Sequence, residues 1–347
     1  MYSRPKFFLG ANSGTDFVSY FKELQERESS MQLFILKGGP GSGKSTLMKR
    51  VMQLAAEKGN ILEVIPCASD PSSLDAFIDH TQGFAMMDGT APHTEDPLLP
   101  GVRHHILYTG DLWDTVKLAQ DSKPIEKLNK KVSDCHKGAG AYIKSATALL
   151  RENKRLAEDF LLQKKALSYA DSIIKMLSGK KEGKVIKRLL SAVSVGKTEF
   201  FDDTVHTLAD KIFVLEDRWG AASELIMKTV SFSAKLKGEN FIYCPCSIMP
   251  EKCDHLIFPD SRIALVTKNP FLDFKGGVKD GGFYTKIDFE EDMLLREKEA
   301  EKLLVLASSL VEKAKVLHDE LEAYYRKAMD FSKMDILFDK IVSRFYN

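Results

Sequence analysis

A glycine-rich stretch in the N-terminal half has the composition and spacing of a phosphate-binding loop. The glycines let consecutive backbone N–H groups point at a phosphate, and a helix that follows them adds the positive end of its dipole. The pattern G-x-x-x-x-G-K-[ST] predicts that Lys44 contacts the β- and γ-phosphates of a nucleotide and that Ser45 binds Mg²⁺. The predicted nucleotide-binding residues are Gly38, Gly39, Pro40, Gly41, Ser42, Gly43, Lys44, Ser45 and Thr46.

The flanking residues predict the elements that position this loop. Residues 33–36 form a short apolar run, typical of a strand buried on both faces of a parallel sheet. After the loop, Leu47, Val51 and Leu54 form one face of a helix, and Gly59 lies where a C-terminal cap is expected. A strand, loop and helix in this order favour the phosphate-binding interpretation over a glycine-rich turn without a ligand.

Two carboxylates follow predicted strands and are candidates for catalysis, together with Lys44. Asp88 ends the apolar run at 84–88, the pattern of a Walker-B strand, and would hold Mg²⁺ through a water; the alternative is a turn residue before Gly89. Asp70 follows a strand predicted over 61–67. It would orient water or a substrate hydroxyl, or else cap a helix that begins at residue 71.

The chain repeats itself at a shift of 179 residues. Residues 34–88 align with 213–267 without a gap, and 15 of the 55 pairs are identical, which predicts a duplicated domain. In the second copy, Ser223 replaces the lysine and Glu224 replaces the Mg²⁺ serine, while Asp217 adds a further negative charge. We therefore expect the second copy not to bind nucleotide phosphates in the usual way.

Both halves end in long apolar series with steps of three and four residues. This 3.5-residue period is typical of coiled-coil seams and predicts a helical hairpin at the end of each half. The expected fold class is α/β: two tandem P-loop NTPase-like three-layer α/β/α cores, each followed by a coiled-coil-like hairpin. The expected domains are an intact core (1–115), a hairpin (116–183), a degenerate core (184–289) and a second hairpin (290–347).

Composition excludes several classes of protein. The 347 residues carry 50 Lys+Arg and 49 Asp+Glu, a net charge of +1, so nucleic acid is not indicated by bulk charge. No apolar stretch approaches the ~20 residues that span a bilayer, and no signal peptide is evident, so we expect a cytoplasmic protein without a membrane partner. Five cysteines do not indicate a disulfide framework. Cys244, Cys246, Cys253 and His255 have zinc-ligand types, but their spacing favours buried strand residues.

The chain resembles an uncharacterised family of bacterial tandem P-loop ATPase-like proteins. The segments that carry the resemblance are 8–12, 35–48, 67–70 and 88–93. The resemblance implies ATP binding without implying a pathway. Members of that family commonly keep a phosphate loop in the second half, and this sequence departs from them there.

These observations predict an ATP-binding protein, a Mg²⁺-dependent ATPase with one live site. Two alternatives stay open: a small-molecule or nucleotide kinase with Asp70 as the base, and an ATP-binding regulatory scaffold with negligible turnover. A protein partner could bind the helical arms. Arg218 and Arg103 are candidate arginine fingers, although pairing of Arg218 with Asp217 or Glu216 is the simpler expectation.

Overall fold

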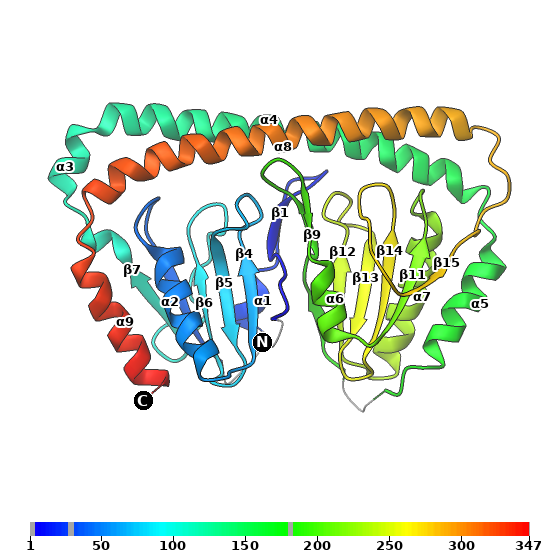
Figure 1. The fold of residues 1–347 in the computed structure, drawn as a ribbon, viewed down its shortest axis with the longest axis horizontal. Coiled ribbons are helices and arrows are strands. Elements are labelled where there is room, and N and C mark those ends of the chain that lie inside the picture. Colours follow the sequence, from blue (N-terminus) through cyan, green and yellow to red (C-terminus); the bar gives the residue numbers. More distant parts are fainter. Residues whose placement is uncertain (1–3, 27–30, 180–182, 347) are drawn as a thin grey trace.

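The protein has a mixed α/β fold, as expected. A computed structural model describes residues 4–26, 31–179 and 183–346. Figure 1 shows two sheets side by side, each with helices on its outer face, beneath two long helices that span both. In the described part of the chain, no helix is long and apolar enough to cross a bilayer.

The first sheet positions the glycine-rich loop. Its strand order is β4-β5-β6-β3-β7, with β3 parallel to both of its neighbours and β5 antiparallel to β4 and β6. Helix α2 begins directly after the loop. The bounds are β3 (Gln32–Lys37), α2 (Lys44–Glu57), β4 (Leu62–Pro66), β5 (Leu74–Asp79), β6 (Phe84–Asp88) and β7 (His104–Tyr108).

The second sheet repeats this arrangement. Its order is β15-β11-β14-β13-β12-β8. When 179 is added to the first and last residue numbers of β3, β4 and β5, the sums are the first and last residue numbers of β11, β12 and β13. The strand expected at 213–215 is therefore present. The bounds are β8 (Val185–Lys187), β11 (Lys211–Glu216), α7 (Ala221–Leu236), β12 (Phe241–Pro245), β13 (Cys253–Phe258), β14 (Ile263–Lys268) and β15 (Val278–Asp280).

Each half also begins with a two-stranded sheet and a short helix. These segments lie between the two large sheets (Figure 1). In the first half, a 3-10 helix and a short helix also follow β7. The bounds are β1 (Gly10–Asn12), β2 (Phe17–Ser19), α1 (Lys22–Glu26), η1 (Thr109–Leu112), α3 (Thr115–Gln120), β9 (Ser191–Val193), β10 (Thr198–Phe200) and α6 (Asp202–Leu208).

The inner faces of the two sheets share one hydrophobic core. Leu33 and Ile35 of β3 belong to the same buried cluster as Ile212 and Val214 of β11. The outer faces pack separately, the first on α2 and the second on α7. The predicted pair of tandem three-layer cores is therefore not confirmed as two separate units, because one buried cluster, which includes residues of α1 and α6, covers the inner faces of both sheets.

The long helices connect the halves instead of forming a hairpin within each. Helix α4 (Ser122–Glu158) and helix α8 (Glu290–Lys327) lie side by side along their length (Figure 1). After α4, helix α5 (Gln163–Ile174) packs on α7 of the second half; after α8, helix α9 (Ser332–Phe345) packs on α2 of the first. The predicted hairpins are thus corrected, since each apolar seam pairs with the seam of the other half.

One smaller expectation also fails. Residues 71–73 form a turn that leads into strand β5, so no helix begins at residue 71. The alternating burial of a strand is masked here because all six residues of β5 are buried between two layers.

Candidate functional site

The loop after β3 has a conformation that requires glycine. Gly41 and Gly43 have φ angles of +63° and +79°, which L-residues with a side chain rarely adopt. A Cβ atom at Gly38 would lie 2.1 Å from Oγ1 of Thr109. That hydroxyl donates to the carbonyl of Lys37 and to Oγ of Ser42, fixing the base of the loop at 3.1 and 2.9 Å.

Lys44 lies across this loop. Its Nζ donates to the carbonyl oxygens of Gly38 and Gly39, both at 2.9 Å, and lies 3.6 Å from Oδ2 of Asp88. Parallel pairing of β3 with β6 brings Lys44 and Asp88 together, because both follow the carboxyl ends of adjacent strands. An ammonium group held by carbonyl oxygens at the mouth of a glycine loop is placed to exchange them for phosphate oxygens.

Asp88 and Ser45 offer the oxygen atoms that Mg²⁺ prefers. Oδ1 of Asp88 accepts from the backbone N–H of Thr90 at 2.9 Å and from its hydroxyl at 2.5 Å, while Oδ2 faces Lys44. Oγ of Ser45 accepts from the N–H of Leu74 at 2.9 Å. Asp88 is therefore both a turn residue and a carboxylate at the loop. The described residues hold no group of three or more His, Cys, Asp or Glu side chains arranged for a metal, so Mg²⁺ here would need phosphate and water ligands as well.

Asp70 has different partners. Its Oδ1 accepts from the N–H of Ser72 at 3.1 Å and from the hydroxyl at 2.6 Å, and its Oδ2 lies 3.5 Å from Nζ of Lys315 in α8. It therefore stabilises the turn before β5 and pairs with the long helix. These contacts do not bring it to Lys44 or Asp88.

The C-terminal end of α8 covers the outside of the loop, which the sequence analysis missed. A Cβ at Gly41 would lie 2.7 Å from the carbonyl oxygen of Glu322, and one at Gly39 would lie 3.0 Å from Trp113. The Trp113 ring contacts Tyr325, with centroids 5.2 Å apart. No local signal marks these contacts, since almost three hundred residues separate the loop from α8.

In the second half, a carboxylate fills the corresponding loop. Asp217 is 1% exposed. Its Oδ1 accepts from the N–H groups of Trp219 (3.2 Å) and Gly220 (3.0 Å), and its Oδ2 accepts from the N–H of Ser223 at 2.6 Å. The Tyr284 hydroxyl donates to Oδ1 at 2.6 Å. The loop amides that would bind phosphate thus bind the chain's own carboxylate.

Crossing helices also cover this second loop. Nζ of Lys154, near the end of α4, lies 2.6 Å from Oε2 of Glu224, the residue in the position of Ser45. Arg218 pairs with Glu297 of α8 through two bonds of 2.9 and 2.7 Å, so the expected pairing with Asp217 or Glu216 is wrong. These bonds hold Arg218 against the second half and do not direct it to Lys44.

The cysteines and histidine considered for zinc are buried in the second sheet. Cys244, Cys246 and Cys253 are buried free thiols, and burial raises the pKa of each. Burial lowers the pKa of His255 to about 4, so this imidazole is neutral at pH 7. Nearby, the Lys252 ammonium pairs with the Asp254 carboxylate.

A second missed feature is an ion pair close to the first loop. Nε2 of His93 lies 3.2 Å from Oδ2 of Asp75, and both side chains are buried. Burial by itself would lower the pKa of His93, but the hydrogen bond and charge of Asp75 outweigh it and raise that pKa. His93 therefore stabilises the segment after Asp88, a role that its position in a loop did not indicate.

Comparison with known families gives a short match. Residues 11–72 match the family model described as mitochondrial ribosomal death-associated protein 3, a segment that contains the glycine-rich loop but less than a fifth of the chain. The resemblance to an uncharacterised bacterial tandem family is therefore corrected, because the matching family model is that of a mitochondrial ribosomal protein. Searches of curated proteins and of solved structures returned no match.

Proposed function

We propose that the first half binds Mg·ATP at the loop formed by residues 38–46 and hydrolyses it slowly, while the second half binds no nucleotide. The observation that carries the proposal is the contrast between the two loops. In the first, Lys44 and Asp88 meet at 3.6 Å, and no acceptor among the described residues takes the N–H groups of the loop glycines. In the second, Asp217 occupies the amides and Ser223 replaces the lysine.

The residues of the first site divide the work of phosphate binding. The loop amides would hold the β-phosphate, and Nζ of Lys44 would neutralise charge between the β- and γ-phosphates. Ser45 and Asp88 would hold Mg²⁺, which neutralises charge on the leaving phosphate when bound. Gly89 follows Asp88, so no adjacent carboxylate activates water, and this favours slow turnover.

The kinase alternative loses its candidate base. Asp70 would have to accept a proton from a substrate hydroxyl beside Lys44, yet its contacts are with Ser72 and Lys315 and do not bring it to Lys44 or Asp88. The scaffold alternative differs from the ATPase only in turnover. Both use the same loop, and a measurement of phosphate release separates them.

Nucleotide binding would act on the long helices. The end of α8 touches the loop at Gly41, and α8 pairs with α4, whose own end is bound to the second loop by Lys154. A phosphate that enters the first loop would therefore change either the position or the mobility of the end of α8. The second loop, which already holds Asp217, would serve as the fixed end of the pair.

The family match suggests a macromolecular partner. The matched family is named for the mitochondrial ribosome, and we propose ribosome association as a second function to be tested by co-sedimentation with ribosomes at several salt concentrations. A protein partner at the helical arms and a cytoplasmic location remain part of the proposal.

Calorimetry tests the main proposal. Titration of the full chain with ATP, ADP and GTP in the presence of Mg²⁺ should give one site per chain, and phosphate release from the same sample should be slow but measurable. Two equivalent sites would refute the role assigned to Asp217. Binding of one ATP without phosphate release would replace the ATPase with the scaffold.

A further inference from the structure

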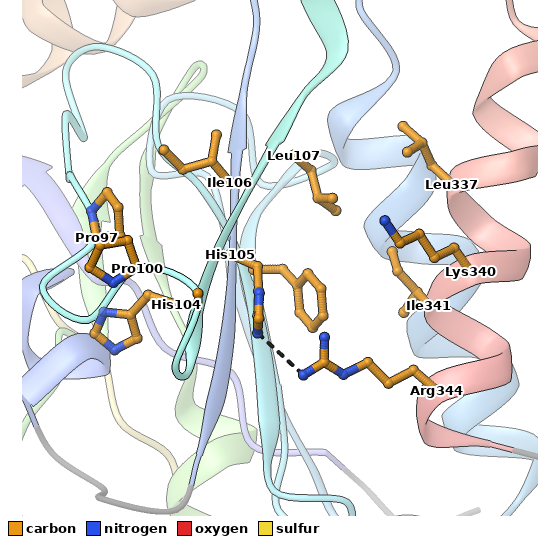
Figure 2. Close-up of a pocket in the computed structure, with 12 residues that line it drawn as sticks. Pro97, Pro100, His104, His105, Ile106, Leu107, Leu337, Lys340, Ile341 and Arg344 are labelled. Atoms are coloured by element: carbon orange, nitrogen blue, oxygen red, sulfur yellow. Dashed lines mark hydrogen bonds between the residues drawn. The ribbon is translucent and has the colours of Figure 1, made fainter.

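A groove runs between strand β7 and helix α9 at the edge of the first sheet. The cavity has a volume of about 330 Å³ and is lined on one side by Ile106 and Leu107 and on the other by Leu337 and Ile341 (Figure 2). In Figure 2, Leu107 and the two residues of α9 point toward the space between strand and helix, whereas the side chain of Ile106 points to the opposite side of the strand. The groove lies outside the phosphate loop and has no part in the function proposed above.

One wall of the groove is a sheet edge that is covered at His104, whose N–H donates to Leu99 and whose carbonyl accepts from Gly101, and is open beyond it. Strand β7 is the last strand of its sheet, and the N–H of Leu33 in β3 donates to the carbonyl of Arg103. In a parallel pair, alternate residues direct their backbone groups to the same neighbour, so His105 and Leu107 face β3. The N–H and C=O of Ile106 then point to the open edge, and its side chain is 50% exposed.

The other wall carries positive charge. Lys340 and Arg344 of α9 line the cavity, and no carboxylate among the described residues lines it with them. Arg344 donates to Oε1 of Gln32 at 2.9 Å and lies 3.3 Å from Nε2 of His105. Burial, followed by the charges of Arg344 and Lys340, lowers the pKa of His105, so the imidazole itself adds no charge.

The matching place in the second half is filled. There, Tyr169 of α5 packs against Phe283, with ring centroids 5.8 Å apart, after strand β15. Nζ of Lys165 donates to the carbonyl oxygens of Gly281 and Gly282 at 2.6 and 3.2 Å. The groove is therefore specific to the first half and is not a general consequence of placing a helix beside an edge strand.

We propose that this groove binds an extended peptide segment of a partner protein, which adds a strand to the edge of β7 and places an acidic group beside Lys340 and Arg344. Strand addition uses backbone hydrogen bonds for affinity and side-chain pockets for specificity. A second copy of the chain is disfavoured as the occupant, because pairing two β7 edges would bring two such cationic walls together.

The test selects peptides from a phage-displayed random library on the full-length protein. Selected sequences should alternate apolar and other residues and carry Asp, Glu or a free C-terminal carboxylate. The double variant Lys340→Glu/Arg344→Glu should weaken their binding by about tenfold or more, since a charge-assisted hydrogen bond is replaced by repulsion. Ile106→Pro should weaken it as well, because proline removes an edge N–H, whereas Ile106→Val should not.

Several outcomes would overturn the proposal. One is that no peptides are selected. A second is that the selected peptides bind the double variant and Ile106→Pro as tightly as the wild type. A third is that sedimentation shows a dimer that the double variant dissociates. Binding of a labelled RNA oligonucleotide that the double variant abolishes, with peptide binding unchanged, would also overturn it. ATP titration of the same variants should return wild-type stoichiometry, so a failure here is distinct from a failure at the phosphate loop.

Discussion

The two glycine-containing loops after β3 and β11 have the same place in the fold and opposite contents. In the first, the N–H groups of the loop glycines have no acceptor among the described residues, and Lys44 donates to two loop carbonyl oxygens near Asp88. In the second, Asp217 accepts three loop amides and a tyrosine hydroxyl. The difference shows that buried loop N–H groups need an acceptor, and that in the second loop a side-chain carboxylate supplies it.

The same difference extends to the crossing helices. At the second loop, Lys154 of α4 makes a 2.6 Å ion pair with Glu224, which fixes the helix. At the first loop, α8 contacts glycine backbone, and Arg326 beside it pairs with Glu322 of its own helix at 3.2 Å. The end of α4 thus meets the second loop through an ion pair, whereas α8 meets the first loop through backbone packing and reaches the first half by charge at the Asp70–Lys315 pair.

The largest expected effect is loss of nucleotide from the first loop. Lys44→Ala removes the charge that faces the phosphates, and calorimetry should show ATP affinity reduced by about a hundredfold or more. Lys49→Ala is the matched control, since it lies on the same helix and is exposed. If Lys44→Ala binds ATP as the wild type does, the two loops do not differ in the way described.

Removing the carboxylate from the second loop should destabilise the protein. Asp217→Ala leaves three buried N–H groups without their acceptor, and we expect the free energy of unfolding to fall by about 3 kcal/mol in denaturant titration. Inorganic phosphate should restore part of this loss, raising the free energy of unfolding of Asp217→Ala by more than it raises that of the wild type. Glu216→Ala, an exposed neighbour, serves as the control, and equal loss in both variants would contradict the anion-site interpretation.

His255 and His93, one buried histidine from each half, should give opposite pH responses. The pKa of His255 is depressed to about 4, so stability is complete above pH 6.5 and falls as pH drops from 6.5 to 4, by up to about 3 kcal/mol. The pKa of His93 is raised by Asp75, so its contribution is complete below pH 6.5 and is lost as pH rises through the folded-state pKa. The free energy of unfolding should be measured as a function of pH for both variants. His255→Gln should reduce its fall below pH 6.5, and His93→Gln should reduce its fall at higher pH. Unchanged limbs would show that neither histidine is linked to folding.

A smaller effect is expected for the carboxylate near Lys44. Asp88→Asn keeps an oxygen that accepts from Thr90, so the fold is retained, but a ligand charge for Mg²⁺ is lost. ATP affinity in the presence of Mg²⁺ should fall by about tenfold, with little change in its absence. The same Mg²⁺ dependence in variant and wild type would leave Asp88 as a turn residue alone.

The smallest effect is expected for Arg218. The Arg218 side chain is 48% exposed and that of its partner Glu297 is 8% exposed, so Arg218→Ala should lower the free energy of unfolding by about 1 kcal/mol. Because the pair belongs to the second half, phosphate release should be unchanged. A selective loss of turnover in Arg218→Ala would return this residue to the role of an arginine finger.

The sequence by itself determined the local elements and the main candidate site. The apolar run before Gly38 predicted β3, the G-x-x-x-x-G-K-S pattern predicted a loop with glycine conformations, and Asp88 was placed at the end of a strand. The shift of 179 residues predicted β11. These features depend on short-range sterics and periodicity, which are written in consecutive residues.

Three features depend on contacts that form only in the folded chain: which long helices pack together, which residues cover the loop, and which groups Asp217 binds. A 3.5-residue apolar period predicts an apolar seam along a helix but does not identify the helix that packs against it. Here α4 of the first half packs against α8 of the second, and the inner faces of both sheets share one core. From the sequence alone, Asp217 was expected to repel phosphate. In the folded chain it is buried and accepts hydrogen bonds from the loop N–H groups. Contacts between residues far apart in the chain depend on how whole layers pack, and a linear pattern does not contain that information.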